Sequence, residues 1–156
     1  MRPAISVAVF DWEDPVTVRS VTEALSPYQS VVIPCTSEEA VQAVIVHRRV
    51  DVVVLNLSKP LEKSFHLLSQ IHTKAPQTEV IFVAQFDERM LRAWMEVIQR
   101  GAYEFLPKPL DRDELSHHVV HAAEKHHPVE LRKRAPAESI KNLDTTSKSR
   151  ASAAGA

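Results

Sequence analysis

The sequence predicts an α/β protein built on a parallel β-sheet with helices on both faces. Five short apolar runs, rich in Val, Ile and Phe, alternate with five amphipathic stretches over residues 5–125. The connections between these segments have the lengths that usually join strands to helices. Because strand–helix units repeated in this way pack their helices against a shared sheet, both faces of that sheet should be covered.

The first two strand–helix units begin with an apolar run at residues 5–10, which predicts a strand. A helix follows Pro15, since proline is favoured at the start of a helix. Its inward face is predicted to hold Val18, Val21 and Leu25. The second strand is predicted at residues 30–33, and Thr36 with Glu39 is predicted to form the capping box of the second helix. The buried face of that helix should consist of Ala40, Val41, Val44 and Ile45.

The third and fourth units follow the same order. Residues 52–57 are a continuous apolar run that ends in a polar side chain, as expected of a strand buried on both faces. The third helix ends before Pro76, and its inward residues are predicted to be Phe65, Leu68 and Ile71. The fourth strand is predicted at residues 80–83, and Gly101 is predicted to cap the fourth helix. The apolar pattern of that helix consists of Leu91, Trp94, Met95 and Ile98.

The fifth unit comprises a short strand at residues 103–106 and a helix capped by Asp111, with Glu114 three residues later. Leu115, Val119 and Ala122 are predicted to face inward. Five such units, joined by right-handed crossovers, suit the flavodoxin-like (βα)5 doubly wound parallel sheet with strand order 2-1-3-4-5. In that order the first and third strands are neighbours, and a cleft forms at their carboxyl ends.

Polar side chains are expected around this cleft. The first strand leads into Asp11-Trp12-Glu13-Asp14, and the third ends at Asn56. The fourth strand delivers Ala84, and the fifth delivers Lys108. Asn56 carries an amide at a place where a carboxylate could serve as a metal ligand or a nucleophile. The function therefore has to be read with this loss of charge in view.

Composition limits the classes of function. The chain has 156 residues, 44% apolar and 25% charged, with a net charge of −1. A near-neutral chain has no overall field that attracts nucleic acid or an anionic membrane. No stretch is apolar enough to cross a bilayer, and no cleavage site follows the N-terminal apolar run, so we expect a cytoplasmic protein. Cys35 is the only cysteine, which excludes an internal disulfide.

The chain is predicted to form one domain at residues 1–127 and a disordered, flexible tail at residues 128–156. The tail is rich in Ala, Ser, Thr and Lys and has few large apolar residues to offset its ordering entropy. The basic run at residues 132–134 is interpreted as part of a solvated tail in preference to a nucleic-acid site.

The order of these elements resembles the receiver domain of bacterial two-component response regulators over about residues 4–125. The most specific part is Gly101-Ala-Tyr-Glu-Phe-Leu-Pro-Lys-Pro109, which is similar to the fifth strand of that family. Residues 51–60, Asp-Val-Val-Val-Leu-Asn-Leu-Ser-Lys-Pro, are similar to its third strand and phosphoacceptor turn. In this family a kinase phosphorylates an Asp after the third strand, beside a Mg²⁺ ion held by acids after the first.

The resemblance implies that some site positions are kept. Asp11 corresponds to the first acid of the metal-binding pair, and Lys108 to the lysine that contacts the phosphate. Phe105 corresponds to the aromatic switch residue on the fifth strand, and Pro60 to the proline of the phosphoacceptor turn.

Other positions depart from the family pattern. Trp12 stands where the second acid would be, and Asn56 stands at the phosphoacceptor position. Ala84 replaces the hydroxyl residue after the fourth strand, and Lys59 replaces an apolar residue of the turn. An indole N–H cannot ligate a metal, an amide is not the ionised nucleophile that phosphoryl transfer needs, and a methyl group cannot bond a phosphoryl oxygen.

These departures predict a pseudo-receiver without enzymatic activity, with weak or absent Mg²⁺ binding and no other cofactor. It is expected to act through protein contacts in a phosphorelay. Its partner is expected to be a histidine kinase, a phosphotransfer protein or an output protein. A homodimer through the fourth helix, fifth strand and fifth helix is a further expectation. Two alternatives stay open: phosphorylation of Asp11 or Asp14, and a module that binds a small ligand or a metal, for which Asp11, Glu13 and Asp14 are weak candidates.

Several side chains have two interpretations each. Trp12 is interpreted as a plug over the cleft in preference to an exposed anchor for a partner. Lys108 is expected to pair with Asp11 in preference to binding an anion. Trp94 is equally compatible with the core and with an interface. His117 and His121, one helical turn apart, could share a metal, but no third ligand stands at a recognisable spacing, so a solvated helix face is favoured.

Overall fold

A computed structural model of the protein describes residues 4–58, 60–88 and 90–126. A five-stranded parallel sheet has the order β2-β1-β3-β4-β5, as predicted. The elements follow one another in the chain as β1 Ile5–Phe10, α1 Val16–Ala24, β2 Ser30–Pro34, α2 Glu38–His47, β3 Val52–Asn56, α3 Leu61–Lys74, β4 Glu79–Gln85, α4 Met90–Gln99, β5 Glu104–Lys108 and α5 Arg112–Lys125.

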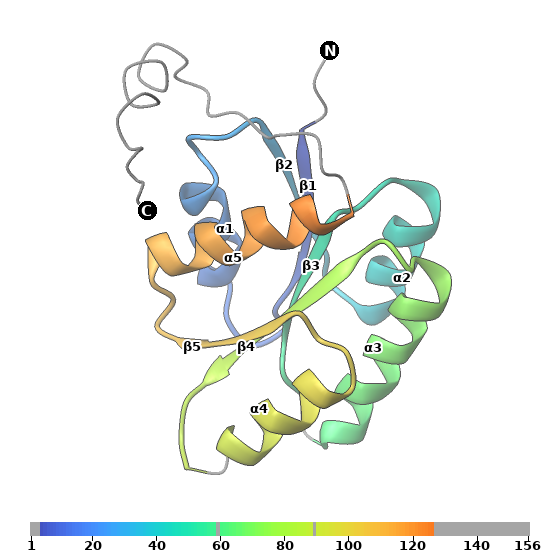
Figure 1. Cartoon of the computed structure of the whole chain (residues 1–156), viewed down its shortest axis with the longest axis vertical. Coiled ribbons are helices and arrows are strands. Elements are labelled where there is room, and N and C mark those ends of the chain that lie inside the picture. Colours follow the sequence, from blue (N-terminus) through green and yellow to red (C-terminus); the bar gives the residue numbers. More distant parts are fainter. Residues whose placement is uncertain (1–3, 59, 89, 127–156) are drawn as a thin grey trace, which may run out of the picture.

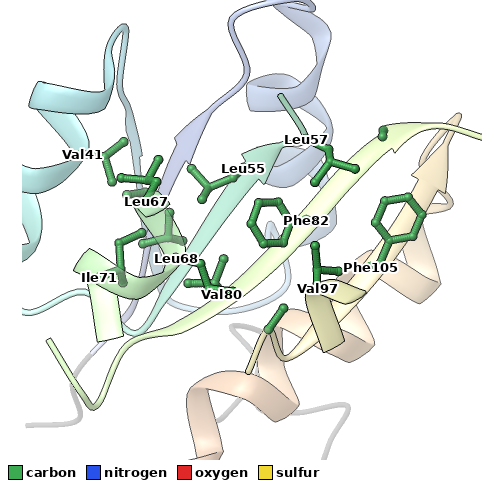
Figure 2. Close-up of a cluster of buried hydrophobic side chains, with 14 of the residues drawn as sticks. Val41, Leu55, Leu57, Leu67, Leu68, Ile71, Val80, Phe82, Val97 and Phe105 are labelled. Atoms are coloured by element: carbon green, nitrogen blue, oxygen red, sulfur yellow. The ribbon is translucent and has the colours of Figure 1, made fainter. Parts of the chain in front are cut away.

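The helices lie in two layers, one on each face of the sheet. Helices α1 and α5 pack side by side on one face, and α2, α3 and α4 cover the other (Figure 1). Figure 2 shows part of the larger apolar cluster, in which Leu55 and Phe82 from the sheet meet Val41, Leu68 and Val97 from the three helices. Each face of the sheet therefore carries its own hydrophobic core.

The central strands β3 and β4 are buried on both faces. Along β3, Val53 and Leu55 belong to the core under α2–α4, whereas Val52 and Val54 belong to the core under α1 and α5. Successive side chains of a strand point to opposite faces, so a strand between two helical layers must be apolar at every position. This explains the continuous apolar run that ends at Asn56.

The predicted capping box of the second helix is wrong by one residue. The side chain of Ser37, not Thr36, caps α2, and its Oγ accepts a hydrogen bond of 3.0 Å from the backbone N–H of Ala40. Glu39 then lies too early in the helix to return the reciprocal bond. The cap predicted at Asp111 is confirmed, since its Oδ2 accepts a hydrogen bond from the backbone N–H of Glu114 at 2.9 Å.

Gly101 ends α4 as predicted. Its φ is +105°, a conformation that favours glycine, and its N–H donates to the carbonyl oxygen of Ile98 at 3.0 Å. The N–H of Ala102 donates to the carbonyl oxygen of Val97 at 2.9 Å, which completes a Schellman motif. This turn leads the chain directly into β5.

Helix α4 turns a different face inward from the one that its largest apolar residues indicate. Met90, Ala93 and Val97 are buried, whereas Leu91, Met95 and Ile98 are exposed. Each exposed residue follows a buried one by one or two positions, so the buried face of the helix lies beside the face that carries its largest apolar side chains. We refer to Leu91, Met95 and Ile98 as the α4 stripe.

The helices of the described part of the chain are all too short or too polar to cross a membrane. The predicted tail at residues 128–156, its basic run at 132–134 and Lys59 lie outside the described residues.

Candidate functional site

The predicted cleft residues meet at the carboxyl edge of the sheet. Asp11 follows β1, Asn56 ends β3, and Ala84 and Lys108 lie near the ends of β4 and β5. The register aligns Asn56 with Val83, and Gln85 with Lys108, so these strand ends come to a common level. Parallel strands bring their carboxyl ends to one edge, and this topology alone assembles the site.

The carboxylate of Asp11 accepts four hydrogen bonds from the protein itself. Its Oδ1 accepts the backbone N–H groups of Glu13 at 3.0 Å and Asp14 at 3.1 Å. Its Oδ2 accepts the hydroxyl of Thr17 at 2.6 Å and the ammonium of Lys108 at 2.7 Å. Both oxygens are thus occupied by internal donors, and the carboxylate holds together the start of α1, the loop before it and β5.

The expected ion pair between Lys108 and Asp11 is present. The Lys108 side chain is 5% exposed and that of Asp11 is 1% exposed, so the pair is buried. Lys108 Nζ also lies 3.6 Å from Asp14 Oδ2, on a side chain that is 35% exposed. The ammonium of Lys108 is therefore shared between two carboxylates.

Asn56 is buried, with 5% of its surface exposed. Its Nδ2 donates to Glu13 Oε1 at 3.3 Å and to the carbonyl oxygen of Leu57 at 3.5 Å. Its Oδ1 is buried and has no hydrogen-bond donor in the described part of the chain. Because a flipped amide would turn this oxygen toward two acceptors, the neighbours fix its orientation.

Trp12 is not the plug that was predicted. The side chain is 56% exposed and lines cavities on both of its sides. It follows a strand end rather than standing inside a strand, so the sheet does not hold it in the core. The exposed anchor, the less favoured sequence interpretation, describes its position better.

One cavity lies between Trp12 and the start of α4. It has a volume of about 240 Å³. Its lining includes Glu13 and Asn56 on one side and Ala84 and Met90 on the other. Ala84 is buried, so a methyl group stands where a hydroxyl would face this cavity. We call this cavity the Trp12 pocket.

The two residues expected to act as a switch or interface lie in contact. Phe105 is buried, and Trp94 is half-buried with its ring centroid 5.7 Å from that of Phe105. Trp94 also packs against the core under α2–α4. The aromatic side chain of β5 is therefore enclosed beneath α4.

The candidate metal ligands either form hydrogen bonds within the protein or come in groups of fewer than three in the described part of the chain. Asp14 Oδ1 accepts the backbone N–H of Val16 at 2.9 Å, and Glu13 is bonded to Asn56. The rings of His117 and His121 contact each other on α5 at a tilt of 44°, with centroids 4.1 Å apart. Within residues 4–58, 60–88 and 90–126, no group of three His, Cys, Asp or Glu side chains has the arrangement of a metal site.

Sequence reasoning did not identify Thr17 or the hydrogen-bonding role of Glu13. Thr17 is buried one turn before Val21 on the inward side of α1, and its hydroxyl bonds to Asp11. A polar residue on an otherwise apolar face was the only signal in the sequence for this role. The bond between Glu13 and Asn56 joins residues 43 positions apart, which no local pattern reveals.

A family model described as the response regulator receiver domain matches residues 8–120. The structure is similar to that of a response regulator from Thermotoga maritima, with a TM-score of 0.70, 23% identity, and coverage of 79% of this chain and 100% of that chain. A signal receiver domain of an HD domain-containing protein from Pseudomonas fluorescens Pf-5 gives a TM-score of 0.67 and 24% identity, covering 81% and 99%.

A pilus assembly protein CpaE from Caulobacter crescentus CB15 is also similar, with a TM-score of 0.60 and 22% identity, covering 75% of this chain and 92% of that chain. At these identities the likeness to solved structures shows the fold alone. The comparison with curated proteins gives no match.

Proposed function

This chain belongs to the response regulator receiver domain family, which works in two-component signalling, and from that premise we propose that it is a pseudo-receiver. In this proposal the chain signals through protein contacts and does not depend on an aspartyl phosphate. The observation that carries the proposal is the buried amide of Asn56 at the end of β3.

The nucleophile is the first missing component. Phosphoryl transfer to a receiver needs an ionised carboxylate, whereas an amide is neutral and far less reactive. Asn56 instead donates its N–H groups to Glu13 and to the carbonyl oxygen of Leu57. The amide thus serves as a cross-link between the loop after β1 and the end of β3.

The metal site is the second missing component. Mg²⁺ requires several hard oxygen ligands in nearly octahedral order. Both oxygens of Asp11 already accept hydrogen bonds, and Trp12 has no oxygen to contribute. The residues present therefore do not fit Mg²⁺, and we infer that its binding is weak or absent.

The third missing component is the set of residues that would respond to a bound phosphoryl group. Ala84 has no hydroxyl to bond a phosphoryl oxygen, and Phe105 is enclosed against Trp94. With no group to sense a phosphate, the conformation is set by the sequence and by binding partners. A partner shifts such an equilibrium by binding one conformation more tightly than another.

The partner class proposed is a signalling protein: a histidine kinase, a phosphotransfer protein or an output protein. The α4 stripe offers an apolar surface for such a contact, or for a homodimer formed through α4, β5 and α5. Leu91 and Met95 are 53% and 59% exposed, which leaves most of their apolar surface open to a partner.

The proposal is tested by incubating the full chain with acetyl phosphate and Mg²⁺, followed by intact-mass measurement. We expect no stoichiometric adduct of about 80 Da, the mass of one phosphoryl group. A stoichiometric adduct on Asp11 or Asp14 would establish the rival interpretation, an active phosphoacceptor that uses a neighbouring acid. Thermal-shift titrations with Mg²⁺, Zn²⁺ and phosphate test the second rival, because a ligand that binds the native state raises its melting temperature.

Variants separate the missing components. Asn56→Asp alone should show little phosphorylation, because Trp12 leaves the metal site incomplete and no bound cation neutralises the new carboxylate beside Glu13. Adding Trp12→Asp should increase phosphorylation far more than either change alone. The matched control is Gln99→Glu, which adds a carboxylate at the exposed C-terminal end of α4 instead. Efficient phosphorylation of Asn56→Asp by itself would contradict the role given to Trp12.

A further inference from the structure

We propose that the Trp12 pocket binds the guanidinium group of an arginine side chain presented by a partner protein. The proposal rests on the proposed function, because it requires a cleft that holds neither a phosphoryl group nor Mg²⁺. In a phosphorylated receiver this edge of the sheet accommodates an anion, whereas the groups around the Trp12 pocket favour a cation.

The shape and lining of the pocket suit a long side chain with a polar end. Its apolar wall consists of Leu57, Leu61, Ala84 and Met90, next to its polar wall at Glu13 and Asn56. An arginine has an aliphatic stem that packs on apolar surface and a planar charged end with five N–H donors. The volume of about 240 Å³ accommodates one such side chain and not a folded segment.

The charge of the lining favours a cation. The lining contains the carboxylate of Glu13 and, among its described residues, no Lys or Arg. The second carboxylate of the lining, that of Asp87, already accepts the backbone N–H of Met90 at 3.1 Å. The nearby ammonium of Lys108 is paired with Asp11 and approaches Asp14, so its charge is compensated within the protein. A guanidinium entering the pocket would meet the opposite charge of Glu13.

The buried amide supplies an acceptor. Asn56 Oδ1 lacks a donor among the described residues, and leaving a buried acceptor unpaired is unfavourable. The hydrogen bond from Asn56 Nδ2 to Glu13 Oε1 prevents the amide from flipping, so the oxygen keeps its position. A ligand N–H group that reaches Oδ1 would donate a hydrogen bond to this oxygen, and the positive charge of the ligand would pair with the carboxylate of Glu13.

Trp12 supplies the third contact. A guanidinium stacks on the face of an indole ring by cation–π attraction, and arginine makes this contact more often than lysine. Trp12 is 56% exposed, so its ring is open to a ligand. An aromatic face, a carboxylate and an amide oxygen around one pocket match the planar fork of arginine better than the compact ammonium of lysine.

The test uses two-dimensional NMR of the full chain, in which the indole N–H of Trp12 and the side-chain amide of Asn56 report binding. Trp94→Phe assigns the two indole signals. The probe is N-acetyl-arginine N-methylamide, compared with its neutral citrulline analogue and with its lysine analogue. We expect both reporter signals to shift with arginine, and the citrulline analogue to bind about tenfold more weakly, because it lacks the charge.

Two matched substitutions locate the site. Glu13→Gln should weaken binding of the arginine probe about tenfold and leave the citrulline analogue unchanged. Glu38→Gln removes a carboxylate from the cavity on the other side of Trp12 and should have no effect. Asn56→Asp should strengthen binding of the arginine probe, because it adds a charge of opposite sign in place of the amide.

Several results would overturn the proposal. These are equal binding of the arginine and citrulline probes, absence of any shift at millimolar concentration, or an effect of Glu38→Gln in place of Glu13→Gln. Agmatine, which has the guanidinium but no peptide backbone, tests for a free small molecule. Binding of agmatine without binding of the arginine probe would contradict a partner side chain.

Failure of this inference can be told from failure of the proposed function. Phosphorylation is measured separately by intact mass with acetyl phosphate. If the chain takes up phosphate and also binds the arginine probe, the pseudo-receiver proposal fails and the proposal for the Trp12 pocket stands. If the chain neither takes up phosphate nor binds the arginine probe, the pseudo-receiver proposal stands and the proposal for the Trp12 pocket fails.

Discussion

The carboxylate of Asp11 shows how the partners of one residue limit what that residue can bind. Two backbone N–H groups, a hydroxyl and an ammonium bind its oxygens. A carboxylate that already accepts this many internal hydrogen bonds has little capacity left for a metal ion. At the scale of single residues, the chemistry of the cleft is decided by which partners each group already has.

The pair of Lys108 and Asp11 leads to a stability prediction. Lys108→Met should destabilise the protein by about 3–5 kcal/mol, because it leaves a carboxylate that is 1% exposed without its counter-ion. The double variant Asp11→Asn with Lys108→Met removes both charges and should be more stable than Lys108→Met alone. Urea unfolding gives both values, and a loss below about 1 kcal/mol for Lys108→Met would contradict the buried pair.

Cys35 leads to a prediction about pH. Burial raises the pKa of its thiol above the ordinary value of 9.0. A raised native pKa contributes stability that is present in full below 9.0 and is lost as the pH rises through the higher native value. Cys35→Ala should therefore reduce the loss of unfolding free energy between neutral and strongly alkaline pH. Tyr103, whose pKa is also raised by burial, remains in both proteins as a shared background. Identical alkaline losses in both proteins would contradict this effect.

At the scale of elements, helix ends fix where each helix begins relative to the site. Helix α2 begins after Ser37, whose backbone is extended with φ −157° and ψ 165°. Helix α4 ends in the turn at Gly101, which sends the chain into β5 and so delivers Lys108 to the cleft. Local hydrogen bonds at these ends thus determine how the site residues are delivered.

The corrected cap of α2 can be tested with neighbouring substitutions. Ser37→Ala should cost about 1 kcal/mol of stability, because it removes the acceptor for the N–H of Ala40. Thr36→Ala is the matched control and should change stability by less than about 0.5 kcal/mol, since Thr36 is exposed and lies outside the helix. Thermal and urea unfolding measure both. A larger loss for Thr36→Ala than for Ser37→Ala would restore the original assignment.

At the scale of the whole molecule, two separate cores account for most apolar residues of the sheet. The core under α2–α4 and the core under α1 and α5 lie on opposite faces of the sheet, and strands of the sheet contribute side chains to both. The α4 stripe belongs to neither core and remains on the surface. A cluster of exposed apolar side chains on one helix is the usual mark of a contact surface.

This surface leads to a prediction about assembly. If α4 contributes to the proposed homodimer, sedimentation velocity should show concentration-dependent association, and Met95→Glu should abolish it by placing a charge in the interface. Val46→Glu is the matched control, because Val46 is 56% exposed on α2, close to the 59% of Met95. Association that survives Met95→Glu, or a monomer at every concentration, would remove the stripe from the dimer contact.

The sequence determined the sheet and the identity of the groups at its edge. Apolar runs of strand length, alternating with helical patterns, were sufficient to predict all five strands and their order, because parallel strand–helix units have few allowed topologies. The same order placed Asp11, Asn56, Ala84 and Lys108 at one edge. The missing carboxylate at Asn56 needed no structure, since the chemistry of a side chain is a property of its residue type.

Only the tertiary structure decided how these groups are used. Three features depend on which distant residues lie nearby: the Asn56 oxygen that has no donor among the described residues, the exposure of Trp12 and the outward turn of the α4 stripe. Asn56 is held by Glu13, 43 residues away. A helix can also rotate by one residue while keeping its apolar period, so the pattern of α4 did not distinguish its inner face. Sequence patterns report local periodicity, whereas hydrogen-bond satisfaction and burial are set by contacts that form when the chain folds.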